Sequence, residues 1–581
     1  MTGGALVIGL VAATAAGRSA AAELAQRWSD ARDYDEPVAA ALRRAWTECD
    51  GVVCFLAVGA SVRLLAPLLG TKTTDPGVVC VDEARRFAVP VVGGHAGGAN
   101  ALAARVAAAL GCEPVITTAS DAAGIPALDT FGADLGFRVE PGSDQAAVGA
   151  ALLSGTPVTV LADATWPLPP LPANVSTDPE PTAPLIAITD RLIEPPRPAV
   201  VYRPPSLVVG VGASRGAPAT EVLDLVDDAL NEAGLSPLSV GHLATVDAKL
   251  AEPGIVAAAG SRGWPLAGHA ADRLAAIAVP NPSEVVRAAV GTPSVAEAAA
   301  LAGGRAELVV AKRVSRHATV AVARHAPRGR LTLVGLGPGA RDLMTPRASA
   351  AIVRAGVVVG LDSYLDQVRD LLRPGTRVLA SGLGAEEKRA AAAVAAARDG
   401  HAVALLGSGD AGVYAMGSPA LALAGADIDV VGVPGVTAAL AAAALLGAPL
   451  GHDAATISLS DLHTPWEVIE RRVEAAAAGD FVVTFYNPRS RDRDWQLGKA
   501  LALLAAARHP QTPVGIVREA SRPEQRVLLT TLAEFSAGPD CDPECDPVYD
   551  VDMRSVVVVG SSTSHVVAGR MVTPRGYRWQ S

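Results

Sequence analysis

The chain has 581 residues, of which 50% are hydrophobic and 19% are charged, and its formal net charge is −10. This length is more than a single hydrophobic core organises, and the high share of apolar residues excludes an intrinsically disordered chain. The acidic balance argues against nucleic acid as the main partner, although a local basic cluster would still bind a small acidic molecule.

The six cysteines are too few for a disulfide framework in a chain of this length. Cys541 and Cys545 lie in an acidic loop without further ligands nearby, so we predict no metal site and leave the role of this pair open. The apolar start has no preceding Lys or Arg, and no apolar run reaches the roughly 20 residues of a membrane span without a charge or turn signal. We therefore expect a cytoplasmic protein with no membrane partner. The other four cysteines are expected to be buried thiols: Cys49, Cys54, Cys80 and Cys112.

Short runs of Val, Ile and Leu alternate with Ala-rich stretches along most of the chain. This alternation is typical of βαβ units and predicts an α/β fold with several parallel or mixed sheets flanked by helices. The runs predicted as strands include Gly51–Val58, Val78–Asp82, Leu207–Val211, Leu331–Val334 and Phe481–Tyr486.

Two stretches interrupt the alternation and suggest where domains meet. Trp166–Pro205 contains many prolines and is expected to be irregular or linker-like. Arg324–Arg330 is a short basic joint before a new strand. The predicted domains are 1–135, an α/β domain; 136–205, a middle segment with the Pro-rich linker; 206–327, a second α/β domain; and 328–578, the C-terminal domain.

The motif GGHAGGAN, at Gly93–Asn100, is the first that indicates chemistry. Four glycines around one histidine expose backbone N–H groups beside an imidazole. This pairing suits a site that stabilises an oxyanion while the histidine transfers a proton. The alternative is a structural histidine in a tight turn.

This motif, with KTTDPGVVCVD at 72–82 and GCEPVITTASD at 111–121, resembles the cobalt-precorrin-5A hydrolase family. Members open a lactone on a corrin macrocycle and release its two-carbon fragment as acetaldehyde. GVGASRG at 210–216, KLAE at 249–252, VGTPSVAEAAAL at 290–301 and Lys312 resemble the C-terminal module of that family. The resemblance spans about 1–325.

The hydrolase resemblance implies that His95 activates water or protonates the leaving alkoxide. It places Lys249 with the catalytic groups and Arg215 as a carboxylate ligand. Most relatives carry Cys-Arg where this chain has Ala213 and Ser214, so a cysteine nucleophile is excluded there. A non-catalytic corrinoid-binding module therefore remains the alternative for this half. The oxyanion and substrate contacts implied by the resemblance are Gly93, Gly94, Gly97, Gly98 and Asn100.

The segment LTLVGLGPG, at Leu331–Gly339, is a predicted strand that runs into a glycine-rich loop. A nicotinamide-binding loop is an alternative, because Ala340 and Asp362 stand at suitable positions for that motif. Pro338 argues against it, since proline lacks the N–H group that would face a pyrophosphate.

Further motifs follow in order: GSGDAGVY at 407–414, VPGVTA at 433–438, FYNP at 485–488 and TPRGY at 573–577. Together with GLGPG they resemble the class III S-adenosylmethionine-dependent methyltransferases of tetrapyrrole synthesis. GAPLGHD at 447–453 and ISLSDLHTPW at 457–466 resemble the C17-methyltransferases of cobalamin (vitamin B12) synthesis, which methylate precorrin-3B or cobalt-factor III and contract its ring. The resemblance implies two α/β subdomains with the cofactor folded in the cleft between them.

The methyltransferase resemblance implies a set of cofactor contacts. Asp410 is expected to hold the charged amino-acid end of S-adenosylmethionine, Thr437 and Ala438 to lie near its methionine part, and Tyr486 and Asn487 to hold the adenosine. The complete set is Gly337, Pro338, Gly339, Gly409, Asp410, Val413, Tyr414, Thr437, Ala438, Tyr486 and Asn487.

The turn at Ser458–Thr464 is expected to serve ring contraction. His463 is its only side chain that titrates near neutral pH and is the predicted proton-transfer group, with Asp461 as a second catalytic residue. Ser460 is expected to contact the substrate. The alternative is that Ser460 and Asp461 only cap a helix that starts near Pro465.

The acetate and propionate groups of a tetrapyrrole require cations in the cleft. Arg489, Arg491 and Arg493 suit bidentate contacts with carboxylates, and the alternative is a solvated charged loop. Lys388 and Arg389 form a second candidate pair. The combined expectation is a bifunctional enzyme of corrin synthesis that forms a homodimer through the methyltransferase domain. Neighbouring pathway enzymes are possible partners, and cobalt is expected to arrive only as part of the substrate.

Overall fold

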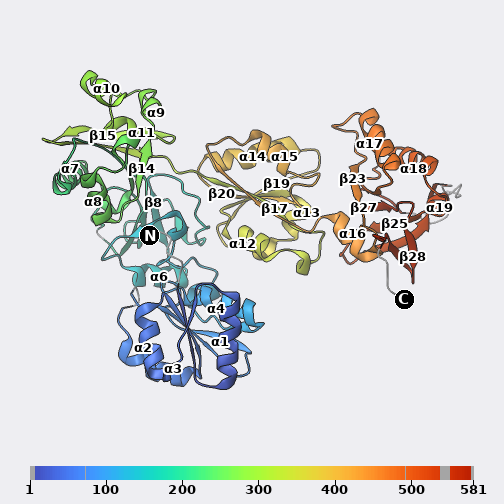
Figure 1. Ribbon diagram of the computed structural model, residues 1–581, viewed down its shortest axis with the longest axis horizontal. Coiled ribbons are helices and arrows are strands. Elements are labelled where there is room, and N and C mark those ends of the chain that lie inside the picture. Colours follow the sequence, from blue (N-terminus) through green and yellow to red (C-terminus); the bar gives the residue numbers. More distant parts are fainter. Residues whose placement is uncertain (1–6, 72–73, 196, 491–492, 537–549, 577–581) are drawn as a thin grey trace. The chain divides into compact units, whose positions relative to one another are not determined.

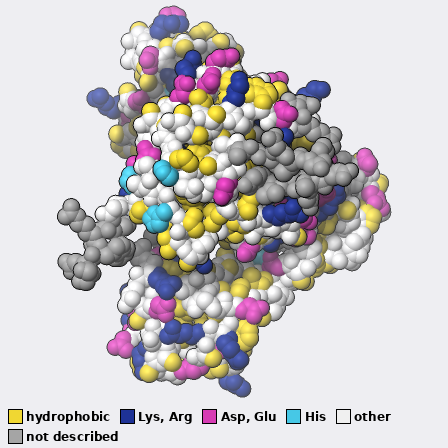
Figure 2. Space-filling view, turned by 90° about the vertical axis from the view of Figure 1, so that its right-hand side faces the viewer, with side chains coloured by type: hydrophobic (Ala, Val, Ile, Leu, Met, Phe, Trp, Pro, Cys, Tyr) yellow, Lys and Arg dark blue, Asp and Glu magenta, His cyan; other side chains and the backbone are white. Residues whose placement is uncertain are grey.

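The computed structural model describes residues 7–71, 74–195, 197–490, 493–536 and 550–576. The chain divides into two units, 1–165 with 170–327 and 166–169 with 328–581. Each unit is built from sheets that helices cover (Figure 1). Among the described helices, none is long and apolar enough to cross a membrane. On the face that Figure 2 shows, Lys and Arg side chains are interspersed with Asp and Glu and form no continuous basic surface.

The first unit begins with a six-stranded sheet in the order β2-β1-β3-β4-β5-β6. Strands β1 to β4 are parallel, whereas β5 runs antiparallel to β4. Helices α1 and α4 pack on one face of the sheet and α2 and α3 on the other (Figure 1), which is why β3 and β4 are buried at every position. The elements are β1 Ile8–Ala12, α1 Ala15–Arg27, β2 Ala31–Asp33, α2 Val38–Glu48, β3 Gly51–Phe55, α3 Val58–Leu65, β4 Gly77–Val81, β5 Phe87–Val92, α4 Ala99–Leu110 and β6 Glu113–Pro114.

The Pro-rich middle segment forms strands, which corrects the expectation that Trp166–Pro205 is irregular or linker-like. Its strands join a five-stranded sheet in the order β7-β11-β10-β8-β9. Pro184 and Pro198 stand immediately before β10 and β11, and Pro204 follows β11. Because these prolines lie outside the strands, they interrupt no ladder of hydrogen bonds. The elements are β7 Arg138–Val139, α6 Gln145–Ser154, β8 Val158–Ala162, β9 Val175–Ser176, β10 Leu185–Ile188 and β11 Ala199–Arg203.

The third sheet of the first unit has the order β14-β13-β12-β16-β15. Strands β12, β13 and β14 are parallel, so the loops after their carboxyl ends lie along one edge of the sheet. Helices α7 and α8 pack on one face and α11 on the other. The elements are β12 Leu207–Ala213, α7 Ala219–Glu232, β13 Val240–Val246, α8 Pro253–Arg262, β14 Leu266–His269, α9 Ala271–Ala275, α10 Glu284–Val290, α11 Ala296–Leu301, β15 Ala306–Val314 and β16 Ala318–His325.

The second unit contains a parallel five-stranded sheet in the order β19-β18-β20-β17-β21. Helices α14 and α15 cover one face, and α12 and α13 the other (Figure 1). The elements are β17 Arg330–Gly335, α12 Pro346–Arg354, β18 Val357–Leu361, α13 Asp362–Asp366, β19 Arg377–Ser381, α14 Glu386–Arg398, β20 Ala402–Gly407, α15 Gly417–Leu423 and β21 Asp429–Val433.

The other large sheet of this unit is mixed, in the order β23-β24-β27-β25-β26. Only β23 and β24 are parallel, and a small sheet β22-β29-β28 lies apart from it. The elements are α16 Ala438–Leu446, β22 Gly447–Ala448, β23 Ala454–Ser458, α17 Trp466–Ala478, β24 Val482–Tyr486, α18 Gln496–Ala507, β25 Pro513–Arg518, β26 Arg526–Thr531, α19 Leu532–Ser536, β27 Ser555–Val559, β28 His565–Val567 and β29 Arg570–Val572. The strands predicted from apolar runs are confirmed as β3, β4, β12, β17 and β24.

Gly210 illustrates how a motif residue serves the fold. An added Cβ at this position of β12 would overlap the carbonyl oxygen of Ala296 at the start of α11. We expect Gly210→Ala to destabilise the third sheet by about 3 kcal/mol, because the helix would have to move away from the strand. Gly260→Ala in α8 is the matched control: its Cβ would meet open space, and it should stabilise by about 0.5–1 kcal/mol. Thermal unfolding of the two full-length variants checks the opposite signs.

Candidate active sites

The loop between β5 and α4 holds His95 in a closely packed turn. The amides of Gly98, Ala99 and Asn100 donate to the carbonyl oxygens of His95, Gly93 and Gly94, respectively. The N–H group of Gly98 is therefore engaged inside the turn and is not free for an oxyanion. The amides of Gly94, His95, Ala96 and Gly97 have no acceptor among the described residues, and they are donors that the turn leaves available.

A carboxylate orients the His95 ring. Asp121 Oδ2 lies 2.7 Å from His95 Nε2, and the His95 side chain is 17% exposed. Asp121 Oδ2 also accepts from Asn100 Nδ2 at 2.9 Å and from the Thr118 hydroxyl. An ionised carboxylate only accepts hydrogen bonds, so Nε2 carries the proton and Nδ1 is left as the basic nitrogen. The site is therefore an aspartate–histidine pair, the arrangement of a general base.

Sequence reasoning missed the roles of Thr118 and Asp121. Both fall within the 111–121 stretch that resembled the hydrolase family, but no local pattern signals their contact with His95. Asp121 reaches the histidine across 26 residues of chain because α4 returns the chain to the start of β5 and β6 then runs parallel to β5 towards the His95 turn.

Arg215 and Lys249 lie on a different sheet from His95, at the edge formed by the carboxyl ends of β12 and β13. Lys249 Nζ is 3.0 Å from Glu252 Oε2, and the amide of Gly216 donates to Glu252 Oε1 at 2.6 Å. The Gly216 amide and then Lys249 lower the pKa of Glu252 below its usual value. Lys249 thus already pairs with a carboxylate, whereas Arg215 is exposed. Lys312 Nζ donates to the carbonyl oxygen of Asn281 and so holds the loop before α10 against β15.

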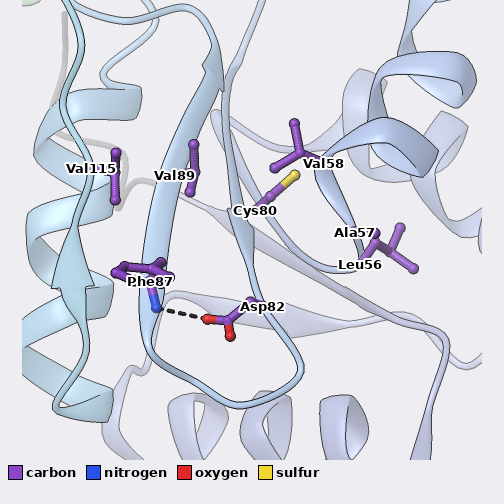
Figure 3. Close-up of a pocket in the computed structure, with 8 residues that line it drawn as sticks. All are labelled: Leu56, Ala57, Val58, Cys80, Asp82, Phe87, Val89 and Val115. Carbon is purple, nitrogen blue, oxygen red and sulfur yellow. Dashed lines mark hydrogen bonds between the residues drawn. The ribbon is translucent and has the colours of Figure 1, made fainter.

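A cavity of about 470 Å³ opens at the end of the first sheet opposite to His95. Its walls come from the ends of β3 and β4 and the start of β5, and they are mostly apolar (Figure 3). The carboxylate of Asp82 accepts hydrogen bonds from the amides of Arg86 and Phe87. Because β5 runs antiparallel to β4, the loop that carries His95 lies beside the start of β4 rather than its end. The lining residues are Leu56, Ala57, Val58, Cys80, Asp82, Phe87, Val89 and Val115.

In the second unit, three glycine-rich loops meet at the carboxyl edge of the parallel sheet. Gly337 and Gly409 exchange backbone hydrogen bonds of 3.0 and 2.8 Å. A Cβ on Gly335 would lie 2.6 Å from the amide nitrogen of Gly435, so only glycine permits this approach. Pro338 is buried in the same loop. A short 3₁₀ turn follows, and α12 begins only at Pro346. The loop therefore does not open a helix, as a nicotinamide-binding loop requires.

Asp410 joins two of these loops. Its carboxylate oxygens accept from the amides of Gly412 at 2.8 Å and Gly435 at 3.0 Å. The Val413 amide donates to the Asp410 carbonyl oxygen. The Asp410 carboxylate therefore already holds the loops in place. Its remaining lone pairs would make the contact with the cofactor that the sequence predicts.

Two tyrosines bring the remaining cofactor candidates together. The Tyr486 hydroxyl lies 2.5 Å from Thr437 Oγ1 and accepts from the amide of Ala439, the second residue of α16 after Ala438. The Tyr414 and Tyr486 rings lie 5.3 Å apart. Tyr414 and Asn487 have φ angles of 50° and 49°, which non-glycine residues rarely adopt outside functional sites. Burial raises the pKa of Tyr414.

The Ser458–Thr464 turn does not cap the following helix. Helix α17 has Pro465 at its N-cap and no side-chain cap. Asp461 Oδ2 instead accepts from Gln496 Nε2 of α18 at 2.9 Å, and Ser458 Oγ accepts from the Ser460 amide and from Asn487 Nδ2. His463 is exposed and forms no hydrogen bond with the described residues.

The expected cations differ in their surroundings. Arg489 is exposed, whereas Arg493 is only 7% exposed and donates to Met553 Sδ. Burial lowers the pKa of Arg493, and Asp461 counteracts this shift. Lys388 is exposed, but Arg389 is buried and donates to Ser381 and to the Gly382 carbonyl oxygen, so the two do not form a joint cationic pair. Gly576 has a φ of 72°. Six residues named in or within the predicted motifs lie outside the described residues: Lys72, Thr73, Arg491, Cys541, Cys545 and Tyr577.

A loop at 519–525, between β25 and β26, contacts the glycine loop and was missed from the sequence. Arg522 Nε donates to the Pro338 carbonyl oxygen at 3.0 Å, and Ser521 Oγ accepts from the Ala340 amide at 3.1 Å. An added Cβ on Gly339 would lie 2.5 Å from Arg522 Cγ. This loop connects the mixed sheet to the parallel sheet at the site.

The two sheets and the glycine loops define the chain as a tetrapyrrole methylase in its second unit. Residues 330–536 match the family of tetrapyrrole (corrin/porphyrin) methylases. Residues 40–121, 126–204 and 207–323 match the N-terminal region of cobalamin synthesis G, a cobalamin biosynthesis central region and the C-terminus of cobalamin synthesis G.

Similar proteins indicate which members of the tetrapyrrole methylases this chain resembles. The chain is 46% identical over 250 residues to the probable cobalt-factor III C(17)-methyltransferase of Salmonella typhimurium, covering 42% of this chain and 99% of that protein. It is 39% identical to the cobalt-factor III methyltransferase of Priestia megaterium, but spans only 46% of that protein. The crystal structure of the methyltransferase CobJ is 37% identical, covers 42% of this chain and 100% of its own, and gives a TM-score of 0.38.

The chain therefore belongs to the tetrapyrrole methylase family and carries the cobalamin synthesis G regions in the same polypeptide. It is an enzyme of cobalamin biosynthesis, and its family methylates with S-adenosylmethionine. The predicted family membership of both halves is confirmed.

The packing of Gly339 against Arg522 gives a direct test of the methylase site. We expect Gly339→Ala to weaken binding of S-adenosylhomocysteine at least about 10-fold, because a side chain at a φ of 152° and 2.5 Å from Arg522 Cγ forces the glycine loop to shift. Gly432→Ala in the neighbouring strand β21 is the control, since its Cβ would meet open space. Isothermal titration calorimetry compares the two variants, and equal affinities would contradict the packing argument.

Proposed function

We propose that the second unit transfers a methyl group from S-adenosylmethionine to C17 of precorrin-3B or cobalt-factor III and promotes contraction of the ring. The observation that carries this proposal is the match to 99% of the length of the Salmonella typhimurium relative, at 46% identity. The sequence motifs of the family fall at one cluster of loops, which supports the same substrate class.

The residues present fit S-adenosylmethionine. The glycines of the three loops bring backbone segments close together beside the predicted cofactor contacts, and the Tyr414 and Tyr486 rings offer an apolar wall. The Gly409–Asp410 loop and Thr437 would hold the amino-acid part, and Tyr486 and Asn487 the adenosine. When bound, the cofactor supplies an electrophilic methyl group, so the protein has mainly to align the ring carbon with it.

Ring contraction requires a proton to move and a carbon–carbon bond to migrate. We assign the proton transfer to His463, which is exposed and carries no competing hydrogen bond within the described ranges. Asp461 acts by holding the turn against Gln496. Arg489 binds the acidic side chains of the ring from the following loop.

We expect His463→Ala to retain methyl transfer but to slow ring contraction about 100-fold, because general acid–base catalysis contributes about 10²–10⁴-fold. His452→Ala is the matched control, as this exposed histidine of the same subdomain pairs only with Asp453. Mass spectrometry measures methylation, which adds mass, and absorption spectroscopy measures contraction, which changes the absorption spectrum. A normal contraction rate in His463→Ala would remove this residue from the mechanism.

We further propose that residues 1–327 open the lactone of cobalt-precorrin-5A and release acetaldehyde. In this scheme His95 Nδ1 takes a proton from water, and the oxygen of that water adds to the lactone carbonyl while the free turn amides hold the oxyanion. The ring C–O bond breaks to give an alkoxide. The alkoxide then collapses to the aldehyde as its carbon–carbon bond to the macrocycle breaks, and the conjugated macrocycle takes up the electron pair and then the proton held by the imidazolium. The Asp121 carboxylate stabilises the imidazolium throughout.

Two variants test the aspartate–histidine pair. We expect His95→Ala to abolish acetaldehyde release and Asp121→Asn to reduce it about 100-fold or more, because an amide no longer stabilises the imidazolium and favours the wrong tautomer. His317→Ala serves as control, since this histidine belongs to the third sheet and binds Glu221. Unchanged release in His95→Ala would remove this residue from the mechanism. No release from the wild type would instead favour the corrinoid-binding module, an alternative that the pairing of Lys249 with Glu252 supports.

We also propose that the protein forms a homodimer through the second unit and works in the cytoplasm alongside neighbouring pathway enzymes. Exposed apolar side chains on α16 and β28 support a subunit contact: Leu440, Leu445, Val566 and Val567. The four described cysteines are free thiols, as in a reducing compartment. Analytical ultracentrifugation of the full chain tests the dimer.

A further inference from the structure

The loop at 519–525 is held in a strained conformation next to the methylase site. Glu519 and Ser521 have φ angles of 49° and 62°, although neither is glycine. Such conformations cost about 1–3 kcal/mol each and persist only where the surroundings enforce them. Here the Glu519 amide donates to Arg554, the Ser521 amide to Gln525 Oε1, and the Arg522 amide to Glu519. The structure therefore fixes the direction of the Arg522 side chain.

Arg522 lies against the glycine loop. Its Nε donates to the Pro338 carbonyl oxygen, and its side chain covers Gly339 so closely that no Cβ fits there. The Ala340 amide donates to Ser521 Oγ, which leaves the hydroxyl proton of Ser521 free to donate to another acceptor. Both side chains thus present donors at the same point of the loop.

Groups of both signs surround Arg522, and Asp550 and Asp552 pair with Arg518 nearby. Glu519 is only 5% exposed and pairs with two arginines: Arg554 Nη1 at 2.5 Å and Arg522 Nη1 at 3.4 Å from its carboxylate oxygens. One carboxylate therefore serves two guanidinium groups. Nη2 of Arg522 has no partner within the described part of the chain, and the side chain is 28% exposed. Burial raises the pKa of the Tyr364 phenol, and the nearby positive charges of Arg389 and Arg522 counteract that shift.

We propose that Arg522, with the hydroxyl of Ser521, binds a carboxylate side chain of the tetrapyrrole at the glycine loop. This inference rests on the proposed methyltransferase function and deepens it. A guanidinium with its Nε anchored on Pro338 turns its free terminal nitrogen toward an incoming anion, and such charge-assisted hydrogen bonds are strong. Because the same side chain touches Pro338 and Gly339, the bound carboxylate sets the position of the macrocycle relative to the cofactor loop.

The test uses the full chain and compares Arg522→Ala and Arg522→Lys with Arg526→Ala. Arg526 is the matched control, since it begins the next strand, is 73% exposed and lies 3.9 Å from Asp550. We expect Arg522→Ala to raise the KM for the tetrapyrrole about 10- to 100-fold, as for a lost hydrogen bond between charged groups. Arg522→Lys keeps the charge but loses the planar fork, and should raise KM by less. All three variants should bind S-adenosylhomocysteine within about twofold of the wild type.

A second measurement identifies the carboxylate as the group recognised. Uroporphyrin III, a stable tetrapyrrole with only acetate and propionate side chains, is compared with its methyl ester in a fluorescence binding assay. The wild type and Arg526→Ala should prefer the free acid, and Arg522→Ala and Arg522→Lys should lose part or all of that preference. Equal thermal unfolding of the variants shows that the change is local.

The outcomes separate this inference from the function on which it rests. Methyl transfer by the wild type with an unchanged KM in Arg522→Ala, or an equal loss in Arg526→Ala, overturns the carboxylate site alone. No methyl transfer by the wild type, but an acid preference that Arg522→Ala abolishes, overturns the proposed function and retains the site. Neither methyl transfer nor acid preference in the wild type overturns both.

Discussion

The methylase site depends on a close approach of backbone segments that no side chain would permit. Gly335, Gly409 and Gly435 come from three different loops, and a Cβ on Gly335 or Gly435 would collide with the backbone of the other two, while Gly409 has a φ of 63°. The parallel sheet makes this possible, because its carboxyl ends deliver the loops after β17, β20 and β21 to one edge. Asp410 then locks two of the loops through their amides. A preorganised cradle of this kind needs little reordering when a ligand binds.

The first unit uses the same architecture for a different chemistry. Its first sheet reverses direction at β5, and this reversal brings the GGHAGGAN turn to the end of the sheet away from the apolar cavity of Figure 3. The imidazole is therefore positioned by an exposed carboxylate rather than by an apolar pocket. Acyl hydrolysis requires a charged group, an oriented base and free amides, and the turn that we propose for lactone opening offers these three features.

The sequence predicted much of this architecture and only part of the sites. Strands such as β4 and β17 were recognisable because parallel strands buried on both faces are continuous apolar runs. The Pro-rich segment was wrongly predicted to be irregular, because its prolines border β10 and β11 instead of interrupting them. The glycine loops were recognisable from their sequence motifs. Asp121 and Arg522 did not, because their partners lie 26 and 184 residues away and meet them only in the folded chain.

The contact between Gly339 and Arg522 has a consequence for how this site can change over generations. Gly339 has a φ of 152°, which strains any side chain, and a Cβ there would also lie 2.5 Å from Arg522 Cγ. A smaller residue at 522 would remove the overlap but not the backbone strain, so glycine at 339 is the more constrained of the two positions. Homologues should therefore vary at position 522 more freely than at position 339.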